Sequence, residues 1–401
     1  KCNCNIMSEE EKYSLLNDVI KEYDKKEKKV KVKKREVMYA SHLDSQIYAY
    51  YASLMQTAYE KKLEQYQINN APIAYRKLKK SNIDFAYEAF RYIDKIKTGV
   101  AIAADVSDFF GTLNHNILKQ RWRQIFDILQ EKLPDDHYAV YKSITKYSYV
   151  ERDKLCETLN ISKSQLRKQY RQFCCIPKFK QIAKENSDLI IKNKAKDNDG
   201  KGIPQGSPIS AVLSNIYMLN YDIIMSNIAE EKGAYYRRYS DDILLICKKE
   251  DQEFFITLIY DLLNAYKLDG NKEKQTISII DNYNNQIIVT PPFQYLGFMY
   301  DGQNILIRSS TIARQKRKTL QAIRSAGRSA KKRKASRIRK KKLYSYYSHL
   351  INQTSKKTRK SNFYTYVRRS YDKTNAHSIK KQMKNHWPWL HEGITKEEEN
   401  L

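Results

Sequence analysis

The 401-residue sequence is poor in several features, and each shortage excludes a class of protein. The spacing of its six cysteines matches that of no zinc site, and we expect reduced thiols rather than a disulfide framework. No stretch approaches the roughly 18 consecutive apolar residues that a transmembrane helix needs. The N-terminus lacks a charged head followed by an apolar core, so no signal peptide is expected. These absences predict a cytoplasmic protein without a membrane partner.

Acidic residues are missing from one long segment. Between Gly302 and Tyr371 there is no Asp or Glu, whereas Lys and Arg are dense. The whole chain has 74 Lys and Arg against 45 Asp and Glu, a formal charge of +29. Solvated helices usually mix charge signs, and aliphatic residues recur here at helical spacing, so the block favours an anionic partner, nucleic acid first. A disordered basic tail is the alternative.

The stretch Tyr235–Cys247 places two runs of aromatic and aliphatic residues around Ser240, Asp241 and Asp242. This pattern predicts a strand, a turn and a second strand, with two adjacent carboxylates in the turn. Asp is common in turns, so the segment by itself is weak evidence for chemistry.

Another carboxylate ends a second predicted strand. Val100–Val106 is apolar and β-compatible, and Asp105 lies at its end. A carboxylate there is costly unless it is paired or binds a metal, although it could instead cap the following helix. Phosphoryl transfer needs two divalent ions about 4 Å apart, and Mg²⁺ prefers carboxylate oxygens. If the two strands are neighbours, Asp105, Asp241 and Asp242 converge on such a site.

The long region between these motifs is polar and largely helical in pattern. It predicts helices over Trp122–Leu133, Tyr138–Tyr149 and Lys163–Phe173, in which we find no chemistry. The loop Gly202–Pro208 follows, and its glycines allow another molecule to approach the backbone. A helix with small residues is predicted from Ser210 to about Met225.

Five motifs between Ile73 and Phe298 resemble, in order, those of reverse transcriptases. They are Asp105-Val-Ser-Asp-Phe-Phe110, Gly202-Ile-Pro-Gln-Gly-Ser-Pro208, Tyr239-Ser-Asp-Asp242, Lys274-Gln-Thr276 and Phe293-Gln-Tyr-Leu-Gly-Phe298. The third departs from the family pattern, because Ser240 stands where other members carry Ala, Met or Val.

The resemblance implies an α+β, right-hand polymerase fold with an antiparallel palm sheet and a mainly helical thumb and N-terminal region. We expect an N-terminal helical extension at 8–68, fingers at 69–104 and a palm at 105–300, with a largely helical insert at 116–200. A basic helical thumb and C-terminal region is expected at 301–401.

The resemblance also implies site residues. Asp105, Asp241 and Asp242 would hold two Mg²⁺ ions, with Mn²⁺ as a substitute, and Phe110 stands where the family places its sugar-selecting ring, which implies deoxynucleotide substrates. The other nucleotide contacts would be Gln205, Arg76, Lys77 and Lys274. Contacts to primer or other nucleic acid are expected from Tyr239, Gly206, Tyr295, Leu296, Gly297 and, in the basic block, Arg314, Lys318, Arg324 and Arg328.

Three segments look most like bacterial abortive-infection and phage-defence reverse transcriptases, with retron and group II intron enzymes as near relatives. They are Ala74-Tyr-Arg-Lys77, Phe110-Gly-Thr-Leu-Asn-His115 with Leu118 and Trp122, and Asn362-Phe-Tyr-Thr-Tyr366. The zinc-binding or endonuclease module of many intron enzymes is not seen, and we expect no integrase or ribonuclease H region.

The leading hypothesis is an RNA-directed DNA polymerase that serves bacterial antiphage defence. Its partners would be an RNA template or noncoding RNA, dNTPs, the DNA product, and a second copy or a partner protein. A template-independent or protein-primed DNA polymerase on the same palm is the second hypothesis. A non-catalytic nucleic-acid-binding scaffold is the third, and the complete acidic triad and the Gln205 loop argue against it.

Overall fold

The structure is a computed structural model that describes residues 37–162, 173–193, 200–348 and 362–401. The chain divides into two units, Lys1–Met38 and Tyr39–Leu401, and every helix and strand described below belongs to the second. Residues 8–36 of the predicted N-terminal extension and most of the helix predicted over Lys163–Phe173 lie outside the described residues. No helix within the described ranges is long and apolar enough to cross a bilayer.

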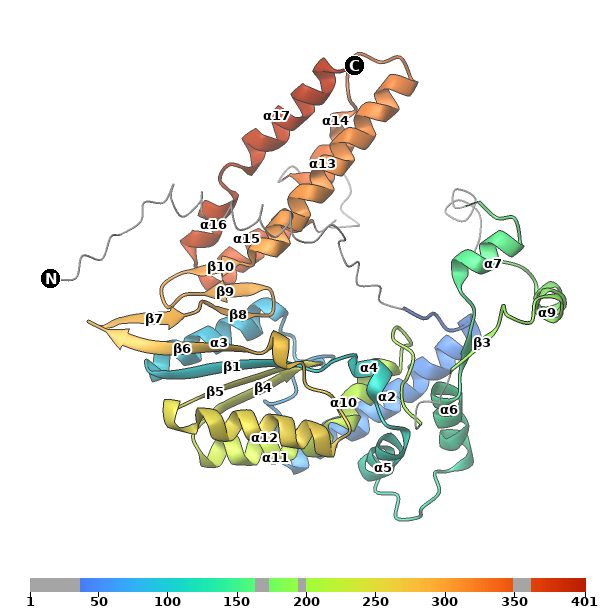
Figure 1. Ribbon diagram of the computed structural model, residues 1–401, viewed down its shortest axis with the longest axis vertical. Helices are drawn as coiled ribbons and strands as arrows, with labels where there is room; N and C mark the ends of the chain where they lie inside the picture. Colours follow the sequence, from blue (N-terminus) through green and yellow to red (C-terminus); the bar gives the residue numbers. More distant parts are fainter. Residues whose placement is uncertain (1–36, 163–172, 194–199, 349–361) are drawn as a thin grey trace. The chain divides into compact units, whose positions relative to one another are not determined.

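A five-stranded antiparallel sheet forms the centre of the second unit (Figure 1). Its strand order is β4-β5-β1-β6-β7, so β1 lies in the middle and β5 beside it. The strands are β1 Gly99–Asp105, β4 Tyr235–Tyr239, β5 Asp242–Cys247, β6 Thr276–Tyr283 and β7 Gln286–Thr290. The predicted strand and hairpin are confirmed, and β1 and β5 read as continuous apolar runs because both of their faces are buried.

Side chains alternate along the strands, so each face of the sheet packs against its own set of helices. On one face Leu245 joins a large core with α2 His42–Gln65, α11 Leu219–Glu231 and α12 Gln252–Ala265. On the other, Leu244 packs with α3 Asn82–Ile96. Figure 1 shows α3 on one side of β1 and α11 and α12 on the other.

The second core also joins α3 to the C-terminal part of the chain. A three-stranded sheet contributes to it, together with α15 Phe363–Thr374 and α16 His377–Met383. Its strands are β8 Phe293–Tyr295, β9 Phe298–Tyr300 and β10 Ile305–Ile307. Asp84 in the first turn of α3 forms an ion pair with Lys373 of α15 at 2.5 Å.

In its described parts, residues 302–348 and 362–371, the basic block is mainly helical rather than a disordered tail. Residues of α13 Ser309–Lys332 share a small core with α17 His386–Glu399, and α14 Lys340–Tyr347 adds Leu343 to it. In α13 the side of Gly327 faces α17 so closely that a Cβ there would lie 2.2 Å from Glu397 Oε1. The apolar stripe of α13 is therefore buried, while its cationic residues remain outside.

The insert between the first two motifs starts with α5 His115–Ile125 and α6 Asp135–Thr145. The side chain of Asn114 caps α5 by accepting hydrogen bonds from the backbone N–H groups of Asn116 and Ile117. The helix predicted over Trp122–Leu133 is wrong, because the fully buried Trp122 belongs to the last turn of α5 and the chain leaves the helix at Asp127, whose φ is 52°.

Beyond α6, a two-stranded ladder closes the base of a separate substructure. Strand β2 Ser148–Tyr149 pairs with β3 Ile191–Lys192. Between them, α7 Arg152–Thr158 and α9 Ile176–Glu185 share a small core of Leu155, Ile182 and Leu189. This core is distinct from the two that pack on the central sheet.

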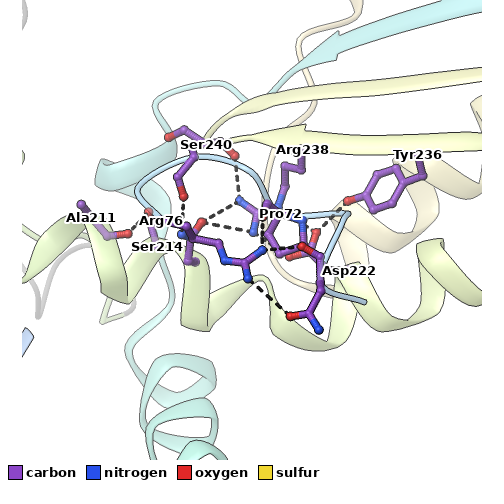
Figure 2. A network of polar contacts seen from close by, with 11 residues as sticks. Pro72, Arg76, Ala211, Ser214, Asp222, Tyr236, Arg238 and Ser240 are labelled. Carbon is purple, nitrogen blue, oxygen red and sulfur yellow. Dashed lines mark hydrogen bonds and ion pairs between the residues drawn. The ribbon is translucent and has the colours of Figure 1, made fainter. Parts of the chain in front are cut away.

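A fully buried ion pair lies beneath the hairpin of β4 and β5 (Figure 2). Arg238 of β4 donates from Nε and Nη2 to the Asp222 carboxylate of α11 at 2.8 and 2.6 Å. The hydroxyl of Tyr236 donates to the same carboxylate at 2.7 Å. Burial alone would lower the pKa of Arg238, but the charge and hydrogen bonds of Asp222 raise it above its usual value.

Arg238 also connects the hairpin turn with the segment that precedes α3. Its Nη1 donates to the Ser240 carbonyl at 3.0 Å. Its backbone N–H donates to Ala71 at 2.8 Å, and its carbonyl accepts from Ile73 at 2.9 Å. The Asn215 side chain accepts from Arg238 and donates to the Ala74 carbonyl. The Arg238 side chain thus joins the turn to two helices, and its backbone and Asn215 hold residues 71–74.

Asp222→Asn tests this network. The substitution leaves the Arg238 guanidinium buried without its counter-charge, which typically costs about 3–5 kcal/mol. Thermal denaturation is expected to show a melting temperature lower by about 4–6 °C. As a matched control, Lys249→Ala removes a half-exposed pair with Asp281 and is expected to cost less than about 1 kcal/mol. Equal shifts for the two variants would contradict the role assigned to Asp222.

Candidate active site

Three carboxylates meet at one end of the central sheet. Asp105, the last residue of β1, is the register partner of Asp242, the first residue of β5. Asp241 is next to Asp242, and its carbonyl accepts a hydrogen bond from Val106 N–H at 3.2 Å. The structure thus brings together residues that are 136 positions apart in the sequence, as the neighbouring-strand hypothesis requires. Asp105 does not cap the next helix, the short α4 Phe109–Thr112, because Asp108 occupies its N-cap position, and Asn114 caps α5 after it.

The turn that carries Asp241 is held in an unusual backbone conformation. Ser240 has a φ of 61°, which is uncommon for a residue with a side chain. Its carbonyl is fixed by Arg238, and its hydroxyl donates to the Tyr75 hydroxyl at 3.3 Å. Tyr239, predicted to contact nucleic acid, is partly buried and packs edge-on against Phe85, with ring centroids 6.4 Å apart.

Negative charge at this end of the sheet is only partly balanced. Desolvation, together with the charges of Asp241 and Asp105, raises the pKa of Asp242 to about 7. Asp242 nevertheless lies at an exposed position, so solvent screens part of this effect. Lys274 donates to the Asp105 carboxylate and lowers the pKa of Asp242.

The donor set fits a hard divalent cation, because it consists of carboxylate oxygens with excess negative charge. Asp105, Asp241 and Asp242 are the residues that would hold such an ion. Within the described ranges, however, no group of three or more His, Cys, Asp and Glu side chains is already arranged around a metal position. Lys274 contacts Asp105 instead, so its predicted place at a triphosphate stays a prediction.

Arg76 is used inside the protein rather than at a triphosphate. Its guanidinium pairs with Glu60 of α2 at 2.5 Å and donates to the carbonyls of Asn69 and Pro72 at 2.6 and 2.8 Å. Only 3% of its side chain is exposed. This geometry does not support the expected nucleotide contact of Arg76, whereas Lys77 is exposed and remains a candidate.

The loop with Gln205 is tied to the turn that follows β1. The backbone N–H groups of Ile203 and Gly202 donate to the carbonyls of Phe110 and Leu113, both at 2.9 Å. Gly202 has a φ of 89°, and a Cβ on it would lie 2.9 Å from the Gly111 carbonyl oxygen. Phe110 and Gln205 are therefore carried by one hydrogen-bonded unit, and both are partly exposed.

The predicted primer motif forms the tight turn between β8 and β9. Leu296 and Gly297 have φ values of 45° and 92°. The Leu296 carbonyl accepts from Asn82 at 3.1 Å, and the Gly297 carbonyl accepts from the backbone of Arg308 at 3.0 Å. Tyr295 is buried beside this turn, its ring stacks on Phe293 with centroids 6.0 Å apart, and its hydroxyl has no hydrogen-bond partner within the described part of the chain.

The other predicted nucleic-acid contacts lie in more open positions. Gly206 is exposed, with a φ of 107°. On α13 the four predicted cationic residues are exposed, and none forms an ion pair with a carboxylate among the described residues. They are Arg314, Lys318, Arg324 and Arg328.

Sequence reasoning missed the residues that position the site. Arg238, Asp222 and Asn215 come from a strand and two helices, and none lies in a motif of its own. One signal was available. Side chains alternate between the two faces along β4, and Arg238 falls on the same buried face as Tyr236, which indicates a buried charge.

Comparisons with known proteins agree with the motifs. The family model described as "Reverse transcriptase (RNA-dependent DNA polymerase)" matches residues 47–300. A curated relative, the retron Se72 reverse transcriptase of Salmonella heidelberg (strain 579083-10), is 28% identical over 92 residues, which are 22% of this chain and 24% of that protein. The chain thus spans about a quarter of the length of the curated relative it matches.

Solved telomerase structures are similar at low scores. Apo telomerase from Candida tropicalis gives a TM-score of 0.38 at 14% identity, over 72% of this chain and 43% of that one. Telomerase from Candida albicans with a TWJ fragment of telomeric RNA gives 0.39 at 12% identity, over 98% and 59%. These scores are too low to add to the assignment. The family model matches more than half of the residues of this chain. The chain therefore belongs to the reverse transcriptase family and has that family's right-hand α+β polymerase fold.

Proposed function

We propose that this chain is an RNA-directed DNA polymerase that joins deoxynucleoside triphosphates along an RNA template. The observation that carries the proposal is the register of Asp105 with Asp242, next to Asp241, in a member of the reverse transcriptase family. Two carboxylates on paired strands and a third in the adjoining turn form a rigid platform for phosphoryl transfer. The same pairing would have no evident use in a nucleic-acid-binding scaffold.

In this proposal Asp105, Asp241 and Asp242 hold two Mg²⁺ ions, with Mn²⁺ as a substitute. When bound, the ions would neutralise charge on the attacking 3′-oxygen and on the departing pyrophosphate. The chain contributes the placement of the carboxylates, because Arg238 fixes the turn and the sheet fixes the strand ends. Lys274, at the rim of the site, is free to turn from Asp105 towards a triphosphate, since half of its side chain is exposed.

Phe110 and Gln205 are proposed to position the incoming nucleotide. Phe110 follows Asp105 by five residues and is anchored through its backbone to Ile203. A ring fixed in this way can exclude a 2′-hydroxyl by contact, which favours deoxynucleotides. Gln205 belongs to the same hydrogen-bonded unit and would contact the nucleotide and its template base.

Nucleic acid is proposed to lie between the palm and the basic helix α13. Residues 69–104 would be the fingers, 105–300 the palm and 301–401 the thumb and C-terminal region. Exposed cations along α13 suit phosphate contacts, which give salt-dependent affinity. The turn at Leu296 and Gly297, held by Asn82, would support the primer end.

We assign the enzyme to bacterial antiphage defence, acting with a noncoding RNA. The support is the resemblance of three short segments to defence-associated reverse transcriptases and the match to a retron reverse transcriptase. The template RNA, the product DNA and a second copy or partner protein belong to this proposal.

Asp241→Asn is expected to abolish dNTP incorporation while RNA binding persists, because it removes a carboxylate ligand and leaves the basic surfaces unchanged. Primer extension on an RNA template and a gel-shift assay measure the two properties, and plaque counts on cells that express each form test the defence role. Equal incorporation by the variant would refute the metal assignment. Nucleotide attached to the wild-type protein in an intact-mass spectrum would favour protein priming instead.

Asp242→Asn is expected to raise the melting temperature by about 2 °C in metal-free buffer at pH 8, since it removes an unfavourable charge that solvent partly screens. The folded pKa, about 7, lies above the ordinary value of 3.8. The penalty is therefore complete above pH 7, so the advantage of the variant should shrink as the pH falls towards 4. The exposed control Asp281→Asn should show no such gain. A lower melting temperature for Asp242→Asn would contradict the electrostatic account.

Phe110→Ala is expected to admit ribonucleotides. Opening the space beside the sugar should raise the efficiency of rNTP relative to dNTP incorporation by about tenfold or more. Single-nucleotide extension with matched rNTP and dNTP measures the ratio. Phe109→Leu, which changes the buried neighbouring ring, is the control and should leave sugar selectivity unchanged. An unaltered ratio in Phe110→Ala would remove the gating role.

A further inference from the structure

A cavity separate from the candidate active site lies in the C-terminal region, between α15 and the segment from α16 to the start of α17. Its volume is about 560 Å³, within the range of about 300–1,000 Å³ typical of small-molecule sites. Residues at i, i+4 and i+7 spacing line it on two sides, one set along α15 and the other running from α16 across the break at Lys384 into α17. They are Tyr364, Arg368 and Tyr371 on one side and Lys380, Lys384 and Trp387 on the other. None of these residues belongs to the candidate active site.

The walls of the cavity are aromatic. Tyr371 lies under the Lys380 ammonium, which is 3.6 Å from the ring centroid. Trp387 is held in place by Tyr344 and His391, with ring centroids 5.3 and 4.3 Å away. Rings fixed in this way offer flat surfaces on which a nucleobase can stack at low entropic cost.

One polar atom in the wall is unsatisfied. The hydroxyl oxygen of Tyr364 is buried and has no hydrogen-bond partner in the described part of the chain. A buried hydroxyl without a partner is costly, so a ligand that supplies one is favoured. Because this oxygen is buried, a side chain in the wall must move before the edge of a base, which carries both donors and acceptors, can reach it.

The rim of the cavity is cationic. Arg368, Lys380 and Lys384 are exposed there, against the single carboxylate of Asp372. That carboxylate lies 3.9 Å from Arg368 Nε, and because both side chains are exposed this ion pair contributes little to stability. The excess positive charge favours an anion beside the aromatic walls and disfavours an apolar peptide.

We propose that this cavity binds one unpaired nucleotide of a single-stranded nucleic acid. Lys380, whose ammonium covers the Tyr371 ring in the structure, would turn with Lys384 and Arg368 towards the flanking phosphates. The base would then stack on the uncovered Tyr371 ring and on Trp387. Bases splayed out of a strand are recognised by such stacking and edge contacts, whereas a duplex offers neither. The inference does not depend on polymerase activity, so it survives if the proposed function fails.

The test is binding of a fluorescent eight-nucleotide oligoadenylate, measured by anisotropy at fixed salt. Lys380→Glu/Lys384→Glu is expected to weaken binding by at least tenfold, because it reverses the charge at the rim. The matched control is Lys180→Glu/Lys184→Glu, two exposed lysines with the same spacing on α9, which should bind within twofold of wild type. Similar losses in both variants would mean general attraction by charge and would overturn the proposal.

Stacking is tested independently of charge. Tyr371→Leu is expected to lose at least about fivefold in affinity for the oligoadenylate, whereas Tyr371→Phe retains it. An abasic octamer of equal charge should bind wild type and Tyr371→Leu equally. Unchanged affinity in Tyr371→Leu would refute the stacking role.

Crosslinking locates the bound strand. A 5-iodouridine octamer should crosslink to peptides that contain Tyr364, Tyr371 or Trp387, and crosslinks confined to other regions would refute the site. Primer extension by Lys380→Glu/Lys384→Glu should match wild type, which separates this site from the active site. AMP at millimolar concentration should compete only weakly, and competition as strong as that of the octamer would point to a free-nucleotide site instead.

Discussion

The placement of the carboxylates in the candidate active site depends on one buried guanidinium. Arg238 satisfies the Ser240 carbonyl, the Asn215 amide oxygen and the Asp222 carboxylate at the same time. A buried charge tolerates few alternative arrangements, because each lost partner leaves an uncompensated group in a low-dielectric interior. The hairpin, helix α11 and residues 71–74 are therefore fixed with respect to one another. The turn that contains Asp241 is therefore held rigidly, although it lies at the end of the sheet.

Charge is distributed unevenly over the described residues, with negative charge at the candidate active site and positive charge on α13 and around the C-terminal cavity. Carboxylates gather at one strand end, where desolvation, followed by the charges of Asp241 and Asp105, raises the pKa of Asp242 to about 7. Cations gather on α13 and around the C-terminal cavity, where carboxylates are scarce. Both arrangements disfavour the folded chain by itself, and each suits a partner of opposite charge. The neutral cores on the two faces of the sheet supply the stability that offsets them.

Much of the central sheet could be predicted because its signals are local. The apolar runs before Asp105 and after Asp242 identify inner strands, and two carboxylates at strand ends suggest one site. Arg238 and Asp222 could not be paired in advance, since nothing in the spacing of a strand residue and a helix residue specifies their contact. Arg76 was placed by a short motif, whereas the structure gives it Glu60 as a partner.

Helix ends were predicted poorly where no stop signal exists. The segment after Trp122 contains neither Gly nor Pro, yet Asp127 adopts a left-handed conformation and ends α5. Likewise, the helix predicted from Ser210 to Met225 is interrupted at Met218, between α10 Ser210–Tyr217 and α11.

The short ladder of β2 and β3 has a further consequence. It brings Tyr149 and Ile191 side by side, so the chain leaves and re-enters the palm at almost the same point. Beyond it, α7 and α9 have their own small core, and among the described residues neither helix contributes a side chain to the cores on the two faces of the central sheet. Lengthening, trimming or exchanging this appendage would therefore leave the carboxylate geometry intact, which makes the ladder a natural graft point for sequences of unrelated length.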